Sequence, residues 1–326
     1  MIKLIITVTI KEVKIFMIHI ENLTKYYGKN PAVNNISFDI GDGEVVGFLG
    51  PNGAGKSTTM NILTGYLSST SGVCTIDGID ILENPGEAKK RIGFLPEVPP
   101  LYPDMTPLEY LNFIYDLKKC TLNRKKHIDE IISVMRLGDY KDRLISHLSK
   151  GYKQRVGIAG ALISNPKVLI FDEPTIGLDP RQIIEIRELI RSLGKNHTII
   201  LSTHILPEVQ AVCDRIIIID KGTIRADKAT SDINELAENK KRFTIQIAGP
   251  RQEVEGVLRR VEGVQSVEYL STSKNNGTLY RVQCKPGYDS RKRIFTSLAE
   301  RQWPIMELNT LGTSLEDIFI ALTSKQ

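Results

Sequence analysis

Residues 50 to 58 read Gly50-Pro51-Asn52-Gly53-Ala54-Gly55-Lys56-Ser57-Thr58, the pattern of a phosphate-binding loop, or Walker A motif. Its glycines permit positive-φ turns, so that successive backbone N–H groups can point into one concavity and surround an anion. The Lys56 side chain can then reach the β- and γ-phosphates of a nucleotide, and the Ser57 hydroxyl can ligate Mg²⁺. The stretch therefore predicts a site for ATP or GTP to which the whole loop contributes.

The sequence on either side of the loop supports this interpretation. Residues 44–49, Glu-Val-Val-Gly-Phe-Leu, read as a buried strand, and residues 57–65 read as a helix whose N-terminus faces the phosphates. A strand, a loop and a helix in this order are what a phosphate loop requires, whereas a chance match to a glycine-rich turn requires neither flank. We therefore expect an α/β fold of the P-loop type.

The composition is that of an ordinary globular protein. Of the 326 residues, 41% are hydrophobic and 25% are charged, and the net charge of +5 is spread along the chain. The even spread argues against a nucleic-acid partner, and it favours a solvated surface of mixed charge over attraction to an anionic membrane. The four cysteines lie far apart without a CxxC pair, so they are expected to be reduced thiols and neither a metal site nor a disulfide framework.

Residues 1–16 precede the first credible strand, which Met17 opens. Residues 4–10 are apolar and follow Lys3, as in a signal peptide, but charged residues come directly after them without a small-residue cleavage site. No apolar run approaches the ~20 residues that a membrane-spanning helix needs. We expect residues 1–16 to be an N-terminal extension, or a mis-assigned start with Met17 as the initiator, whose removal leaves ATPase activity unchanged.

Residues 17–240 are predicted to form one domain, interrupted by a helical subdomain at about 98–165. The expected strands are residues 18–23, 33–40, 45–49, 72–76, 91–94, 168–171, 198–201 and 216–219. The last three are nearly all Val, Ile and Leu, as in parallel strands covered on both faces, and helices at 181–193 and 205–212 between them make right-handed βαβ units. Within the subdomain, Thr106-Pro-Leu-Glu109 is a capping box that starts a helix.

Residues 241–326 are predicted to form a separate accessory module. After a helix at 231–238 and the basic residues 240–242, the pattern is strand, helix, strand, strand, helix, strand. These elements are expected at residues 243–247, 252–261, 264–270, 279–284, 290–301 and 305–308, with a hairpin turn at 275–277. This order suggests a small ferredoxin-like α+β module, followed by a capping box at 313–316 that starts a terminal helix.

A second phosphate-site motif lies at the end of the strand at 168–171, where Asp172 and Glu173 follow directly. An apolar strand that delivers two acids to its C-terminal edge beside a phosphate loop is a Walker B motif. Asp172 is expected to help hold Mg²⁺, and Glu173, on the opposite side of the chain, to polarise the water that attacks the γ-phosphate. Two acids before Pro174 would otherwise read as a turn, but the Walker A motif upstream argues against that reading.

Three more short motifs follow in order: Leu148-Ser-Lys-Gly-Tyr152, Gly177-Leu-Asp179 and Ser202-Thr-His204. With these the chain resembles the nucleotide-binding subunit of ABC transporters. The first motif resembles the family signature LSGGQ, with Ser149 and Gly151 kept at the head of a helix. Lys150 and Tyr152 replace its third and fifth residues.

The resemblance assigns further residues to the nucleotide. Asp179 matches the D-loop, and His204 matches the switch histidine that contacts the γ-phosphate, whereas the other histidines have no such context and are expected to be structural. Tyr27 resembles the aromatic residue that stacks on adenine, although the adjacent Tyr26 is a rival and a core tyrosine is an equal alternative at either position. Glu97 stands where many relatives carry the Q-loop glutamine, and its carboxylate can still reach Mg²⁺ or its waters.

By this resemblance, residues 17–240 form an ATPase that uses ATP and Mg²⁺. The resemblance assigns Lys56, Glu173 and His204 to catalysis, and Ser57, Glu97 and Asp172 to the metal. Two copies are expected to face each other head to tail, with each ATP between the phosphate loop of one copy and Ser149 and Gly151 of the other. Release of phosphate would then part the two copies and move a separate membrane permease.

A more specific resemblance rests on LPEVPPLYPDMT at 95–106, on LSKGY, on GLDP and on Ser314-Leu-Glu-Asp-Ile-Phe319. Together they resemble bacterial exporters of the drug, polysaccharide and gliding-motility kind. This implies a peripheral location at the cytoplasmic face of the membrane, with the helical subdomain and the Glu97 region as the docking face. The alternative is a soluble ABC ATPase that acts on ribosomes or DNA, but such relatives usually carry two cassettes or a long coiled-coil insert. The accessory module is either a ligand sensor or a dimerisation module.

Overall fold

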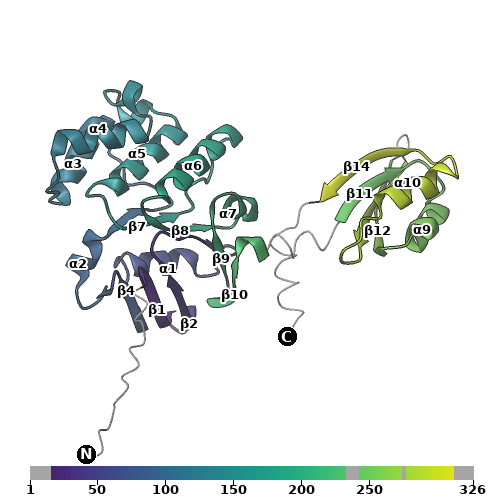
Figure 1. Ribbon diagram of the computed structural model, residues 1–326, viewed down its shortest axis with the longest axis horizontal. Helices are drawn as coiled ribbons and strands as arrows, with labels where there is room; N and C mark the ends of the chain where they lie inside the picture. Colours follow the sequence, from purple (N-terminus) through teal and green to yellow (C-terminus); the bar gives the residue numbers. More distant parts are fainter. Residues whose placement is uncertain (1–15, 233–241, 274–276, 312–326) are drawn as a thin grey trace, which may run out of the picture. The chain divides into compact units, whose positions relative to one another are not determined.

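The computed structural model describes residues 16–232, 242–273 and 277–311. The chain forms two compact units, residues 1–224 and residues 225–326, which are described separately (Figure 1). The boundary expected near residue 240, the turn at 275–277 in part, and the terminal helix after 313 lie outside the described residues. No helix in the described ranges is long and apolar enough to cross a membrane.

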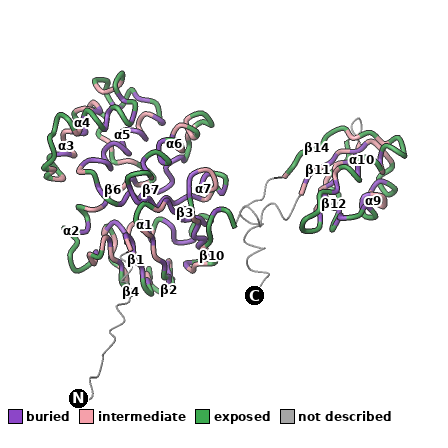
Figure 2. Tube along the Cα trace, viewed as in Figure 1, coloured by how far each residue is buried: buried purple, intermediate pink, exposed green. Residues whose placement is uncertain are grey.

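A six-stranded sheet in the order β10-β9-β3-β8-β7-β6 forms the centre of the first unit, and its edge strand β10 continues past residue 224 into the second. Its strands are β3 (Val45–Leu49), β6 (Ile92–Leu95), β7 (Val168–Asp172), β8 (Thr198–Thr203), β9 (Arg215–Asp220) and β10 (Thr223–Ala229). The five strands from β9 to β6 are parallel. Every residue of β3, β7 and β8 is buried, as predicted for parallel strands covered on both faces, and Figure 2 shows this buried centre.

A second, antiparallel sheet has the order β2-β1-β4-β5. Its strands are β1 (Ile18–Tyr27), β2 (Asn30–Ile40), β4 (Ser71–Ile76) and β5 (Ile79–Asp80). Helix α1 (Lys56–Leu63) contacts strands of both sheets, and a single apolar cluster includes residues from both. The phosphate loop thus leaves β3 in one sheet and enters a helix held between the two.

The helical subdomain follows the sequence prediction closely. It contains α3 (Pro107–Leu117), α4 (Arg124–Val134), two short 3₁₀ turns (Gly138–Tyr140 and Ile145–His147) and α5 (Lys150–Leu162). The capping box is confirmed, because Thr106 N donates to Glu109 Oε2 at 2.8 Å and Glu109 N donates to Thr106 Oγ1 at 3.2 Å. Helix α5 lies against β6, and a Cβ at Gly157 would sit 2.6 Å from Leu95 Cδ1, so a larger residue there would have to displace the Leu95 side chain.

The remaining helices of the first unit flank these sheets. They are α2 (Pro85–Lys90), α6 (Pro180–Leu193) and α7 (Leu206–Val212), and α6 contacts α7. Both α6 and α7 were predicted, whereas α2, β5 and β10 were not. These three are short or polar, so their sequences carry little periodic signal.

The second unit has the predicted order of elements. They are β11 (Arg242–Ile247), α9 (Arg251–Arg260), β12 (Val264–Ser273), β13 (Gly277–Cys284), α10 (Arg291–Ala299) and β14 (Ile305–Leu311). The antiparallel sheet has the order β12-β13-β11-β14, which is the ferredoxin-like arrangement. Alternate residues of β11, among them Phe243 and Ile245, pack with Val254 and Leu258 of α9 in one apolar core.

Candidate active site

The phosphate loop has the backbone that its glycines predict, with one correction. Gly53 and Gly55 have φ values of 78° and 107°, in the region that glycine adopts readily. Gly50 does not have a positive φ, so our reason for a glycine there was wrong. Gly50 is required for lack of space, because a Cβ would lie 2.3 Å from the carbonyl oxygen of Ile219. Gly55 is required for both reasons, because its φ is positive and a Cβ added there would lie 2.5 Å from Ala32 O.

A cavity of about 530 Å³ opens over this loop. It is lined by Ala32, Asn52, Gly53, Gly55, Lys56, Ser57, Thr58, Glu97, Glu173, Ile176 and His204. The structure therefore brings together the Walker A loop, the second Walker B acid, the Q-loop carboxylate and the switch histidine. A volume in this range is ordinary for a cofactor-sized ligand.

Lys56 lines this cavity with a side chain that is almost fully buried. It is 6% exposed, and its ammonium donates to the carbonyl oxygens of Gly50 at 2.9 Å and Pro51 at 3.3 Å. It also lies 3.4 Å from Glu173 Oε1. Lys56 is the first residue of α1, which lies between the two sheets. Its methylene groups are therefore covered, while its ammonium group contacts oxygen atoms.

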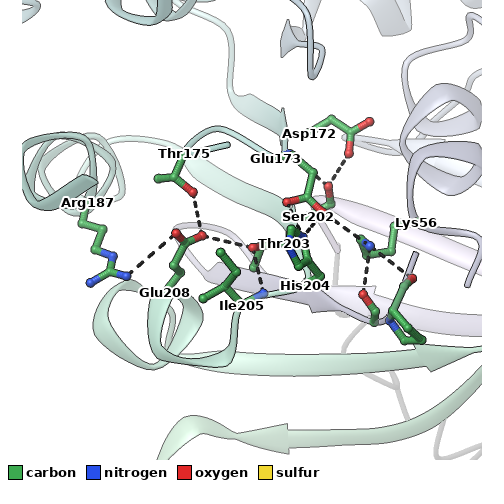
Figure 3. A network of polar contacts seen from close by, with 12 residues as sticks. Lys56, Asp172, Glu173, Thr175, Arg187, Ser202, Thr203, His204, Ile205 and Glu208 are labelled. Carbon is green, nitrogen blue, oxygen red and sulfur yellow. Dashed lines mark hydrogen bonds and ion pairs between the residues drawn. The ribbon is translucent and has the colours of Figure 1, made fainter. Parts of the chain in front are cut away.

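The two acids at the end of β7 point to different partners (Figure 3). Asp172 is 4% exposed and accepts a hydrogen bond from the Ser202 hydroxyl, which lies opposite it in the register of β7 and β8. Glu173 has a φ of 49°, unusual for a residue with a side chain, and its N–H donates to Ser202 O at 3.1 Å. This turn ends the strand and sends the Glu173 carboxylate into the cavity, away from Asp172.

His204 follows the neighbouring strand β8 and meets Glu173. Its Nδ1 lies 3.0 Å and 3.1 Å from the two carboxylate oxygens of Glu173. The side chain is 37% exposed and lines the cavity, so its other ring nitrogen is available to a ligand. Because parallel strands end at the same edge of a sheet, residues 31 positions apart converge here.

Three of the other histidines have partners away from the cavity. His19 Nδ1 lies 2.5 Å from Asp39 Oδ1, and His197 Nδ1 lies 2.7 Å from Pro166 O. His127 Nε2 accepts from Ser164 N at 3.2 Å, and burial lowers the pKa of this imidazole. These contacts accord with the structural role that we expected for them.

Tyr27 is not among the residues that line the cavity, and its contact with adenine stays a prediction. Tyr26 and Tyr27 are 43% and 53% exposed, so the alternative of a core tyrosine is wrong at both positions. Lys25 lies 5.7 Å from the centroid of the Tyr27 ring, a cation–π distance. Ala32, which sequence reasoning missed, lines the cavity from β2, and a residue so small carried no recognisable signal.

Ser149, Gly151 and Asp179 also lie outside the lining of this cavity. Ser149 caps α5 by accepting from Tyr152 N at 3.4 Å, and Asp179 caps α6 by accepting from Arg181 N and Gln182 N at 3.0 Å and 2.9 Å. A Cβ at Gly151 would lie 2.7 Å from Gln182 Cδ, so the starts of α5 and α6 are adjacent. Within one chain, the predicted site residues thus fall into two groups.

The oxygen-bearing residues fit a hard divalent cation that takes further ligands from phosphates. Ser57 and Glu97 line the cavity, and the Asp172 carboxylate lies at the same strand edge. Within the described residues, no group of three His, Cys, Asp or Glu side chains forms a metal site by itself. A cation here would therefore depend on oxygens of the nucleotide and on water, as Mg²⁺ in nucleotide sites generally does.

Comparisons with known proteins agree with this geometry. Residues 33–176 match the family model described as ABC transporter. The bacitracin transport ATP-binding protein BcrA of Bacillus licheniformis is 38% identical over 304 residues, which cover 92% of this chain and 95% of that protein. This chain belongs to the ABC transporter family. The prediction of an ABC ATPase is therefore confirmed.

Other members and solved structures extend the similarity. The lantibiotic transport ATP-binding protein SrtF of Streptococcus pyogenes is 39% identical over 227 residues, or 68% of this chain and 96% of that protein. A solved dimeric bacterial ABC transporter cassette is 30% identical with a TM-score of 0.60, covering 66% of this chain and 99% of the cassette. These similarities confirm the predicted P-loop fold of the ABC type.

Proposed function

We propose that this chain is the Mg²⁺-dependent ATPase subunit of a bacterial exporter, working as a homodimer on a separate membrane permease at the cytoplasmic face. The observation that carries the proposal is the division of the site residues. Lys56, Glu173 and His204 share one cavity, whereas Ser149 and Asp179 lie outside its lining at two helix starts. A single chain therefore holds half of the contacts that the ATP needs.

In the first half-site, each side chain has a distinct task. The ammonium of Lys56 neutralises charge on the β- and γ-phosphates, and the Glu173 carboxylate accepts a proton from the attacking water. His204, 3.0 Å from Glu173, holds that carboxylate and donates toward the γ-phosphate. Mg²⁺ held by Ser57, Asp172 and Glu97 would draw negative charge from the phosphate oxygens.

The second half-site supports a head-to-tail dimer. The N-terminus of α5 follows the exposed Ser149, so its free N–H groups and the positive end of the helix dipole are available to a phosphate of the partner's ATP. The solved cassette at 30% identity is described as dimeric, which supports the same arrangement here. Loss of the γ-phosphate would remove the charge that joins the two copies.

A groove on the first unit suits a permease segment. It has a volume of about 340 Å³ and lies between β6 and helices α3 and α5 of the helical subdomain. The half-buried Phe94, Pro96 and Ile114 and the 83% exposed Tyr66 contribute apolar surface to it, over the buried Ile92 and Leu95. Such an exposed apolar surface, next to Glu97 in sequence, favours docking of a protein helix over contact with water.

The names of the relatives support an exporter rather than a factor that acts on ribosomes or DNA. Besides bacitracin and lantibiotic transport, they include a linearmycin resistance ATP-binding protein of Bacillus subtilis, 31% identical over 317 residues, which cover 95% of this chain and 99% of that protein. Each of these relatives is named as an ATP-binding protein of transport or resistance, which favours the exporter.

Co-expression with a polytopic membrane protein, sought among the products of the neighbouring genes, tests the proposal. We expect the two proteins to co-purify from membranes and the complex to hydrolyse Mg-ATP. Ile114→Arg in the groove should abolish co-purification, while Val134→Arg, at an exposed position of α4, should not. The proposal fails if neither protein binds the other, or if the groove variant binds its partner as well as the control variant.

A further inference from the structure

A buried carboxylate lies beside the active site and has no part in the motifs described above. Glu208 is on the short helix α7, is 4% exposed and does not line the nucleotide cavity. A carboxylate in such a place is costly unless its oxygens are hydrogen-bonded or paired. The partners of Glu208 therefore indicate what it holds.

Glu208 joins three separate segments of the chain (Figure 3). Its Oε2 accepts from Thr175 Oγ1 at 2.6 Å and from Thr203 Oγ1 at 3.0 Å. Its Oε1 faces Arg187 Nη2 of α6 at 3.9 Å. One oxygen atom thus connects the loop after β7 with the end of β8.

On the β8 side, the contact fixes the backbone on both sides of His204. Thr203 Oγ1 accepts from Ile205 N at 3.1 Å, which closes a tight turn over His204. Because the Thr203 hydroxyl donates its proton to Glu208, a lone pair of the same oxygen remains for Ile205 N. Glu208 therefore selects the hydroxyl orientation that holds this turn.

On the β7 side, the contact anchors the loop between Glu173 and Asp179. Thr175 is 5% exposed, and its carbonyl oxygen accepts from Leu178 N at 3.2 Å. Ile176 N donates to Glu173 O at 3.2 Å, so the loop is a pair of linked turns with Thr175 at its centre. If Thr175 moves, the residues before and after it move as well.

We propose that Glu208 is a positioning residue for ATP hydrolysis, which holds the His204 turn and the loop from Glu173 to Asp179 in fixed register. The proposal rests on the catalytic roles proposed above for Glu173 and His204. The two loops come from different strands, and the 3.0 Å contact between the His204 ring and the Glu173 carboxylate depends on their relative position. Glu208 fixes that relative position from outside the cavity, without contacting the nucleotide.

The first test compares two substitutions of Glu208 with a control. Glu208→Leu removes both hydrogen bonds and should lower kcat by about tenfold to a hundredfold with little change in the KM for ATP, because misplaced catalytic groups slow the chemical step. Glu208→Gln keeps an acceptor oxygen for both threonines and should restore kcat to within about threefold of the wild type. Glu188→Leu, at an exposed position of α6, should leave both constants unchanged.

A second variant keeps the test valid if Glu208→Leu folds poorly. Thr203→Val preserves the shape of the side chain but removes its hydroxyl, so it should lower kcat with little change in KM, while the loss of two buried hydrogen bonds lowers the melting temperature by a few degrees without unfolding the protein. The proposal is overturned if Glu208→Gln is as slow as Glu208→Leu, or if Thr203→Val has the wild-type kcat.

A His204→Ala background separates this proposal from the assignment of the site. Because Glu208 acts partly through the His204 turn and partly through the loop that carries Glu173, Glu208→Leu should cause a smaller loss of kcat in that background than in the wild type. An undiminished further loss would overturn the positioning role while leaving the role of His204 intact. If His204→Ala alone keeps the wild-type kcat, the proposed role of His204 fails first, and the positioning role fails with it.

Discussion

The ion pair between Lys56 and Glu173 gives a prediction that can be worked from its geometry. Lys56→Met keeps the apolar stem of the side chain but removes the ammonium that lies 3.4 Å from Glu173 Oε1. Both side chains are less than one-tenth exposed, at 6% and 8%. The substitution therefore leaves a buried carboxylate without its cation, although His204 remains 3.0 Å away.

The magnitude follows from the separation of the charges. Two unit charges at this distance attract by about 5 kcal/mol at an effective dielectric constant of about 20. Removing one partner of a buried pair typically costs about 3–5 kcal/mol, and the lower value suits a pair beside an open cavity. We expect Lys56→Met to lower the free energy of unfolding by about 3 kcal/mol without nucleotide, which a domain of ordinary stability survives.

Urea unfolding of four proteins measures this effect: the wild type, each single variant and the double variant Lys56→Met with Glu173→Gln. The double variant should recover most of the loss, because it removes both charges, and the coupling energy should be about 2 kcal/mol. Saturating Mg-ATP should raise the melting temperature of the wild type but not that of Lys56→Met. Strictly additive losses, or an equal shift with ATP in Lys56→Met, would refute the reasoning.

Two further predictions concern other parts of the first unit. Gly47→Ala places a Cβ 2.4 Å from Val209 Cγ1 and should therefore lower the free energy of unfolding by about 1–3 kcal/mol. Val209→Ala should partly restore it, because it removes the atom that clashes. If the effects of the two substitutions simply add, this prediction is wrong. Burial lowers the pKa of Lys118 from 10.5 to about 8, so between these values the unfolded chain binds the proton and the folded chain does not. The stability of the wild type relative to Lys118→Met should therefore be constant below pH 8 and rise from pH 8 to 10.5, as measured by denaturant unfolding at each pH. A difference that falls over this range would contradict the assignment.

Local motifs made much of the site predictable. The order of strand, loop and helix around Gly55 depends on short-range spacing, and the structure has that order. The meeting of Glu173 with His204 was predictable for a different reason, since each follows a parallel strand and such strands end at one edge. The strand order therefore predicts that Glu173 and His204 lie close together, although they are far apart in the sequence.

Features that depend on tertiary packing were not predictable. The burial of Lys56 follows from the position of α1 between two sheets, and the pairing of strands into two sheets leaves no local trace in the sequence. The sequence carries no signal for Glu208, because its threonine partners lie 33 and 5 residues away on other elements. The stacking of Tyr27 on adenine stays a prediction, since its ring is 53% exposed and its position along the chain does not show which surface it contributes to.

The central claim is that two copies of this chain close around ATP and that Glu173 drives its hydrolysis. Glu173→Gln keeps the size of the side chain but removes the basic carboxylate, so ATP should remain bound and hold the two copies together. In size-exclusion chromatography with Mg-ATP this variant should elute as a dimer, with ADP it should return to the monomer, and the added substitution Ser149→Arg should prevent dimerisation. A Glu173→Gln protein that hydrolyses ATP at the wild-type rate, or that remains monomeric at saturating ATP in the presence of its permease, would contradict the claim.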